Sequence, residues 1–207
     1  MVALLLVLAL AGSSPVGSPA SGLVGQWESA VRTAGGIGNI LEFRADGGVT
    51  QISAAMGEAD YRLEGEWLRA FWKDPAGKVS EVDTILEFEG DRHFLEKAED
   101  GSESTWSERV GEPVPKAGPL LGQWCSLYLE TMPAYREFTA GRMVNRLPIT
   151  TLRGRYAVEG ETLTVQISGQ PEGKYPFRVE NGLLVIKSRD GSEKQYKRPE
   201  TTLLKGY

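Results

Sequence analysis

Gly25-Gln26-Trp27 and Gly122-Gln123-Trp124 are the same tripeptide, and each begins one copy of an internal repeat. Later landmarks recur in the same order, and Asp100-Gly101-Ser102-Glu103 returns as Asp190-Gly191-Ser192-Glu193. The spacing between equivalent positions falls from 97 residues at the tripeptides to 90 at the last landmarks, as loop deletions between duplicated segments would produce. The repeat therefore predicts two domains of the same architecture.

The repeat divides the 207-residue chain into two copies, residues 23–110 and residues 120–199. Residues 111–119 contain three prolines and two glycines, and we expect a stiff, extended linker there. The tail, residues 200–207, has no counterpart in the first copy. Each copy is small, so its core must be thin.

The N-terminus carries an apolar run over residues 2–11, followed by small and turn-forming residues. Such a run is too short to cross a bilayer as a helix and fits the apolar region of a secretory signal. We therefore expect residues 1–20 to be a signal peptide. The mature protein is then secreted or periplasmic, with no stable membrane insertion after cleavage. An uncleaved anchor is the alternative.

Both copies consist of short strand-like runs between turns. Leu163, Val165 and Ile167 alternate with polar residues, the period-two pattern of a half-buried strand. Asn181-Gly182 and Asp190-Gly191 separate alternating runs and are strong hairpin signals. We predict an all-β fold of two tandem small antiparallel up-and-down β-barrels, each with seven or eight short strands, because closure removes open sheet edges. A β-sandwich is the alternative.

The two Gly-x-Trp sequences resemble those of the lipocalin-like (calycin) superfamily. In that superfamily a Gly-x-Trp on the first strand closes one end of the barrel, and a basic residue on the last strand packs over the Trp. The resemblance implies that Arg109 and Arg198 are these basic residues, and a guanidinium over an indole makes a cation–π contact. The closure residues it implies are Gly25, Trp27, Arg109, Gly122, Trp124 and Arg198.

The same resemblance implies a non-enzymatic binding protein for a small apolar molecule, held in a barrel or between the barrels. Each copy is shorter than a full lipocalin, and a short barrel is often filled by its own side chains. The alternative is therefore a protein-interaction or inhibitor module with filled barrels and no small-molecule ligand.

Trp67, Arg69 and Phe71 form the first candidate binding surface. Aligned with the second copy, their neighbours Leu68 and Ala70 match core positions, so these three side chains are predicted to point outward. An outward Trp and Phe on one copy only indicate contact with a ligand, a protein partner or the other domain. A covering loop is the alternative.

The second candidate surface is a set of arginines on the second copy, which could bind an anion or a protein. Its members are Arg136, Arg142, Arg146, Arg153 and Arg155. The alternative is a solvated face that also meets the first copy. The net charges favour attraction between the copies, since residues 21–117 carry −9 and residues 118–207 carry +4. The overall acidity argues against binding to nucleic acid.

No catalytic arrangement of residues is evident. His93 is the only histidine and Cys125 the only cysteine, so nucleophilic catalysis and a transition-metal site have few candidate residues. We expect no enzyme activity, no cofactor and no bound metal.

Overall fold

The computed structural model describes residues 22–74, 77–101, 104–113, 118–129 and 131–199. These residues contain no helix and form a single antiparallel sheet of 14 strands. The predicted all-β antiparallel fold is confirmed. The predicted signal peptide, residues 1–20, and the tail, residues 200–207, lie outside the described residues.

Each copy of the repeat contributes seven strands. The first copy forms β1 (Gly25–Ser29), β2 (Ile37–Phe43), β3 (Gly48–Glu64), β4 (Trp67–Lys73), β5 (Val79–Glu89), β6 (His93–Ala98) and β7 (Ser104–Val110). The second copy forms β8 (Gly122–Tyr128), β9 (Met132–Thr139), β10 (Arg142–Glu159), β11 (Thr162–Ile167), β12 (Gly173–Glu180), β13 (Leu183–Lys187) and β14 (Glu193–Lys197).

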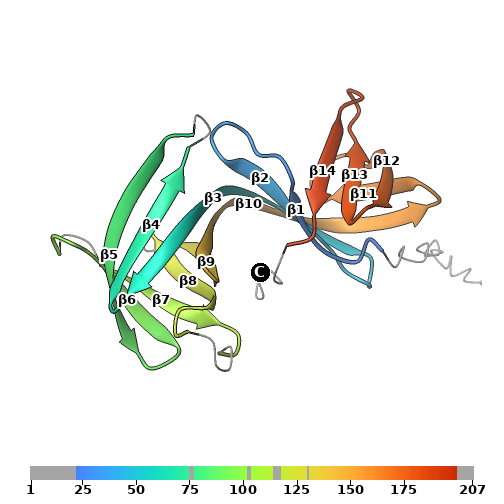
Figure 1. The fold of residues 1–207 in the computed structure, drawn as a ribbon. Coiled ribbons are helices and arrows are strands. Elements are labelled where there is room, and N and C mark those ends of the chain that lie inside the picture. The colour runs from blue at the N-terminus through green and yellow to red at the C-terminus, as the bar shows by residue number, and fades with distance from the viewer. Residues whose placement is uncertain (1–21, 75–76, 102–103, 114–117, 130, 200–207) are drawn as a thin grey trace, which may run out of the picture.

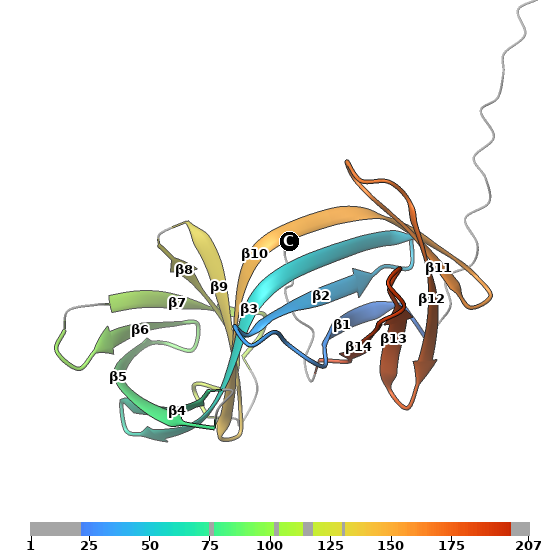
Figure 2. The ribbon, with the colours of Figure 1, turned by 90° about the horizontal axis from the view of Figure 1, so that it is seen from above.

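The sheet closes into a ring, because every strand pairs with its sequence neighbours and β1 pairs with β14. One further pairing, between β3 and β10, crosses the ring and divides it into two closed circuits of eight strands. We call the circuit that contains β4–β9 the middle lobe, and the circuit that contains β1, β2 and β11–β14 the terminal lobe. Figures 1 and 2 show β3 and β10 running side by side from one lobe into the other.

Each lobe is built from both copies of the repeat. In the middle lobe β7 of the first copy pairs with β8 of the second, and in the terminal lobe β1 pairs with β14. The prediction of two tandem barrels, each closed within one copy, is therefore not confirmed. The copies instead exchange strands, and each lobe is completed by strands from the other copy.

The two long strands make this exchange possible. The alternation in the second copy predicts separate strands over residues 143–147 and 152–158, but β10 runs through both. A bulge between Pro148 and Thr150 shifts the register where the two would have separated. Pro has no N–H to donate, so it is tolerated at such an irregularity. The continuous strand carries the chain out of one lobe and into the other.

The linker, predicted to be a spacer between domains, connects two neighbouring strands. Val110, just before it, pairs with Gln123, just after it. Only residues 111–113 and 118–119 of the linker are among the described residues. The chain segments on either side of it are therefore joined by the sheet and not held apart.

Three groups of buried side chains form the core. The terminal lobe is packed around Trp27, Phe43 and Leu184, and the middle lobe around Phe94, Trp124 and Phe138. A third, smaller group lies where the lobes meet and contains Ile40, Ile52, Ala54 and Met56. The junction thus has a hydrophobic core of its own, which fixes the lobes against each other.

Candidate functional site

A buried tryptophan closes one end of each lobe. In the terminal lobe the Trp27 indole donates to the Leu23 carbonyl at 2.8 Å, and in the middle lobe Trp124 donates to Leu120 at 2.7 Å. An arginine covers each indole. The Arg198 guanidinium carbon lies 3.7 Å from the Trp27 ring centroid, and that of Arg109 lies 4.1 Å from the Trp124 centroid.

Both arginines also bind backbone carbonyls near their tryptophan. Arg198 donates to Gly22 at 2.7 Å, while Arg109 donates to Asp91 at 2.6 Å and also to Pro119 and Leu121. Burial lowers the pKa of both guanidinium groups from their usual range. These contacts tie the ends of the strands together, so the Trp and Arg pairs act as plugs at the closed ends of the lobes.

The closure residues expected from the resemblance thus lie together, but with exchanged partners. Arg109 covers the tryptophan of the second copy, and Arg198 covers that of the first. Gly25 and Gly122 both have positive φ, 113° and 120°, where a side chain would be strained. A Cβ on Gly25 would in addition lie 2.5 Å from the Arg198 guanidinium.

The terminal lobe is hollow at the end opposite to its Trp27 plug, with a cavity of about 280 Å³. Most of its lining residues are apolar or aromatic, and five are polar: Asn39, Gln51, Gln170, Ser188 and Lys194. The apolar lining consists of Leu41, Phe43, Val49, Leu163, Val165, Ile167, Pro171, Tyr175, Ile186 and Tyr196. Phe43 and Tyr156 pack edge to face beside it, with ring centroids 5.0 Å apart.

The middle lobe has a larger and more open cavity of about 1030 Å³ at the end opposite to Trp124. Trp72 lines its wall, and Arg136, Glu96 and Asn145 form a polar group within it. The Arg136 guanidinium bonds the Glu96 carboxylate at 2.7 Å and the Asn145 side-chain oxygen at 3.0 Å. Arg136 is therefore not part of an outward arginine surface, because its side chain points into the lobe.

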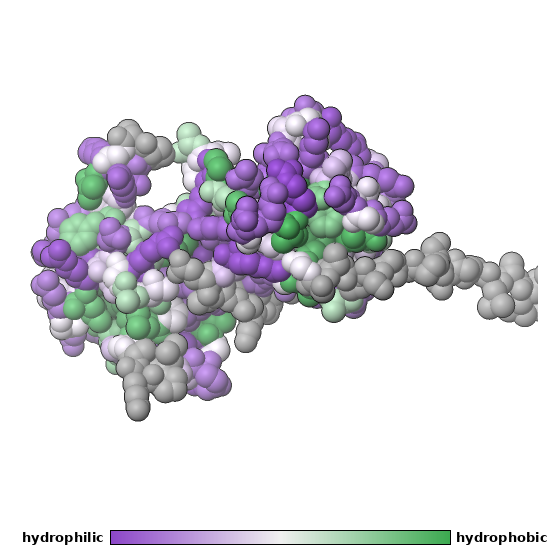
Figure 3. Space-filling model, turned by 45° about the vertical axis from the view of Figure 1, so that its right-hand side comes forward, coloured by the Kyte–Doolittle hydropathy of each residue, from purple (hydrophilic) through white to green (hydrophobic). Residues whose placement is uncertain are grey.

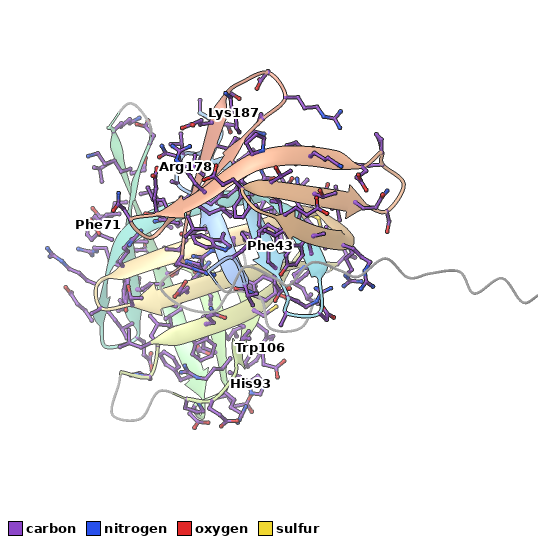
Figure 4. The ribbon with its side chains drawn as sticks, turned by 90° about the vertical axis from the view of Figure 1, so that its right-hand side faces the viewer. Phe43, Phe71, His93, Trp106, Arg178 and Lys187 are labelled. Carbon is purple, nitrogen blue, oxygen red and sulfur yellow. The ribbon has the colours of Figure 1, made fainter. Side chains whose placement is uncertain are left out.

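Trp67, Arg69 and Phe71 point outward from β4 as predicted, while Leu68 and Ala70 are buried. Trp67 is 42% exposed. The Arg69 side chain forms ion pairs with Asp83 and Glu81, both at 3.0 Å. The guanidinium carbon of Arg62 lies 5.7 Å from the centroid of the Phe71 ring. Figure 4 shows Phe71 on the outside of β4. The predicted surface exists, but charged neighbours occupy much of it.

The five arginines of the second candidate surface do not form one exposed patch. Four of them lie on one face of β10, because the bulge shifts the register between the first two and the last two. They are Arg142, Arg146, Arg153 and Arg155. Arg142 is bound to Glu58 and Arg155 to the Asp46 carbonyl. Arg146 is buried. These contacts, with the pair of Arg136 and Glu96, show arginines of the second copy attracted to the acidic first copy.

Arg146 lies in a buried ion cluster where the lobes meet. Its side chain is 3% exposed and contacts Glu137 of β9 at 2.9 Å and Glu28 of β1 at 3.2 Å. Lys197 of β14 lies 3.5 Å from the same Glu28. The cluster joins a strand of the middle lobe to two strands of the terminal lobe. The alternating pattern of the sequence predicts neither this burial nor these partners.

Glu58 forms a second ionic link at the junction, with Arg32 at 2.6 Å and with Arg142. Burial alone raises the pKa of this carboxyl, but the hydrogen bonds from Arg142 and Arg32 outweigh it and hold the pKa below its ordinary value of 4.5. A carboxyl group whose pKa is lower in the folded state than in the unfolded state stabilises the fold at pH values above the unfolded-state pKa. That stability is lost as the pH falls through the folded-state value.

We therefore expect Glu58→Gln to lower the free energy of unfolding at pH 7 by about 1 kcal/mol or less, because the side chain is partly exposed and screened by solvent. At pH 2 the substitution should have little effect. Urea unfolding at both pH values measures this, with Glu159→Gln at the exposed end of β10 as the control. An equal loss at pH 7 and pH 2 would show that the charge of Glu58 has no role.

A shallow hollow lies on the outer face of the middle lobe, over β6, β7 and β8. It includes His93, Trp106, Cys125 and Leu127, and Trp106 is 55% exposed. Figure 4 shows His93 and Trp106 on the strands of this lobe. Burial raises the pKa of the Cys125 thiol, so it is less ionised than a free thiol at neutral pH. This environment does not activate a nucleophile.

Among the described residues, no group of three or more His, Cys, Asp or Glu side chains could hold a metal ion. On the face shown in Figure 3, hydrophobic residues gather in separate patches between hydrophilic ones. Across the described ranges, no helix is long and apolar enough to span a membrane. Comparison of the chain with protein-family models, curated proteins and solved structures finds no match.

Proposed function

We propose that the chain is an exported, non-enzymatic binding protein, and that the terminal lobe holds a small apolar ligand. The observation that carries this proposal is the cavity opposite the Trp27 plug, where ten apolar or aromatic side chains are joined by five polar ones. Ligand sites are typically concave and mainly apolar, with a few polar groups that orient the ligand. A cavity of about 280 Å³ suits a molecule of two or three rings or a short acyl chain.

The cavity is formed by strands of both copies, which gives it a firm wall. Leu41 and Phe43 come from β2 of the first copy, while Leu163 and Val165 come from β11 of the second. The closed end is held by Arg198 and Trp27. A ligand would therefore enter from the opposite, open end. The lipocalin-like resemblance supports the same mode of binding, and export rests on the signal-like residues 1–20.

Filling the terminal cavity should abolish binding of an uncharged apolar probe. Val165→Phe adds a ring to the cavity wall, and we expect it to weaken binding of N-phenyl-1-naphthylamine at least tenfold, because the probe and the new ring compete for one space. Fluorescence titration of the probe measures the affinity. Thr164→Phe on the same strand is the matched control, since neighbouring residues of a strand point to opposite faces.

Equal binding to the wild type and to Val165→Phe would place the probe elsewhere and count against this site. Thermal unfolding of each variant shows whether the fold is retained. Native mass spectrometry of the mature protein from its own host then tests for a natural ligand, which would appear as excess mass released by denaturation.

The second candidate function is a protein-interaction module. Exposed Trp106 and Leu127 in the outer hollow of the middle lobe, together with Trp67 on β4, favour it. Aromatic residues are enriched in protein interfaces. This candidate needs neither cavity, so it becomes the leading function if the terminal cavity binds no apolar probe.

A further inference from the structure

We infer that the middle lobe contains a second binding site, which selects an uncharged molecule with a flat apolar body and a group that both donates and accepts hydrogen bonds. A primary amide is the simplest group of this kind. The site is separate from the terminal-lobe cavity of the proposed function, because it lies in the other lobe and the two cavities share no lining residue.

The polar part of this site is the ion pair between Arg136 and Glu96. Their side chains are only 24% and 17% exposed, and their charged atoms lie 2.7 Å apart. Asn145 accepts a hydrogen bond from Arg136 Nε, which fixes the plane of the guanidinium. Removing two charged groups from water costs free energy, so an ion pair inside a lobe is weak evidence of stabilisation. Its position at the wall of a cavity therefore suggests a role in binding.

The pair presents unused hydrogen-bonding capacity to the cavity. Arg136 uses Nε and Nη1, and Glu96 uses Oε2, whereas Arg136 Nη2 and Glu96 Oε1 make no bond within the described part of the chain. A guanidinium only donates and a carboxylate only accepts. A ligand group that offers both an acceptor and a donor can bind the two together.

The charge of the pair selects against ions. Glu96 cancels the charge of Arg136, so an anion at Arg136 would also face the carboxylate, and a cation at Glu96 would also face the guanidinium. Either ion would lose its hydration without a net opposite charge to replace it. An uncharged polar group avoids this cost and keeps both hydrogen bonds.

The apolar part of the site is Trp72, which lies against a bare stretch of backbone. A Cβ on Gly57 would lie 2.8 Å from the Trp72 ring, so the absence of a side chain there leaves room for the indole. Ala55 and Ala134 also line the cavity and are small. Trp72 thus offers an aromatic ring to a molecule in the cavity, and stacking on such a ring favours aromatic or planar bodies.

Three probes that share one naphthalene body test the site in the full mature chain. They are 2-naphthamide, which is uncharged, 2-naphthoate, an anion, and 2-naphthylmethylammonium, a cation. Isothermal titration calorimetry gives the affinities. We expect wild-type protein to bind the amide about tenfold more tightly than either ion, the ratio that one well-placed hydrogen bond supplies.

Changing the charge of the pair should change the selectivity in opposite directions. Glu96→Gln leaves Arg136 uncompensated, so the naphthoate should gain about tenfold relative to the amide. Arg136→Gln leaves Glu96 uncompensated, so the ammonium probe should gain by a similar ratio. The exposed pair of Arg178 and Glu193, also 2.7 Å apart, supplies matched controls, and Arg178→Gln or Glu193→Gln should leave the selectivity unchanged.

Two further variants locate the probes. Ala134→Trp places an indole in the middle-lobe cavity beside Arg136 and should weaken amide binding at least tenfold, while Val165→Phe in the terminal lobe should not affect it. The inference is overturned if no probe binds, if Val165→Phe removes binding, or if both charge variants keep the wild-type order of probes. If one charge variant does not fold, the change in probe selectivity of the other variant decides the test. If the apolar probe does not bind in the terminal lobe, the proposed function fails, but these outcomes for the middle lobe do not change.

Discussion

Replacing Arg146 by Met should lower the free energy of unfolding by about 3–5 kcal/mol, one of the two largest effects we expect from a single substitution. The side chain is buried between Glu28 and Glu137, and its removal leaves two buried carboxylates without their shared cation. Glu28 then keeps only the longer contact with Lys197. Urea unfolding followed by circular dichroism measures the loss.

Arg153→Met is the matched control, because Arg153 lies on the same face of β10 but is exposed. Its effect should stay within about 0.5 kcal/mol. Adding Glu28→Gln and Glu137→Gln to Arg146→Met should recover most of the loss, since the loss comes from removing the cation that the two buried carboxylates share. A loss below about 1 kcal/mol for Arg146→Met would show that the cluster is hydrated and not buried.

Trp27→Ala should cost about 3–5 kcal/mol, because a fully buried ring is replaced by a cavity at the closed end of the terminal lobe. A double-mutant cycle then identifies its partner. We expect a coupling of about 0.5–2 kcal/mol between Trp27 and Arg198, and none between Trp27 and Arg109. Chemical denaturation of the single and double Ala variants measures both couplings.

The same cycle tests the exchange of strands between the copies. If each copy closed on itself, Trp27 would couple to Arg109 and not to Arg198. Coupling to Arg109 would therefore contradict the pairing of β1 with β14. Trp124 supplies the converse control, because it should couple to Arg109 alone.

Local structure could be predicted from the sequence because its causes are local. Asn181-Gly182 connects β12 and β13 as expected, since Asn181 has the positive φ that such a turn requires. The outward direction of Trp67 and Phe71 also follows from alternation along one strand. A period-two pattern indicates which face of a strand is buried, but it does not indicate which other strand pairs with it.

The exchange could not be predicted, because the copies carry equivalent residues at equivalent places. Arg109 and Arg198 can each cover either tryptophan, so the motif fits the exchanged and the closed arrangement equally well. The signal that was available is the unbroken strand character of β3 and the presence of Pro148 at the bulge of β10. The two predicted strands, over residues 143–147 and 152–158, leave out the residues between them, which belong to β10.

The binding surfaces were only partly predictable for the same reason. The sequence places Arg136 in the second candidate surface, but its side chain points into the middle lobe and contacts Glu96 of the other copy. Burial of Arg146 likewise depends on Glu28, which lies far away in the sequence. Such contacts between distant segments are set by the pairing of β3 with β10, which no local pattern encodes.

The pairing of β1 with β14 also governs how the chain reaches its folded state. The first strand to leave the ribosome finds one of its two neighbours only when the last strand has been made. Until then Trp27 lacks the arginine that covers it, and one edge of β1 stays unpaired. Contacts so distant in sequence make folding slow, and an open strand edge invites association with other chains. Both edges of β1 are therefore paired only after β14 has been made.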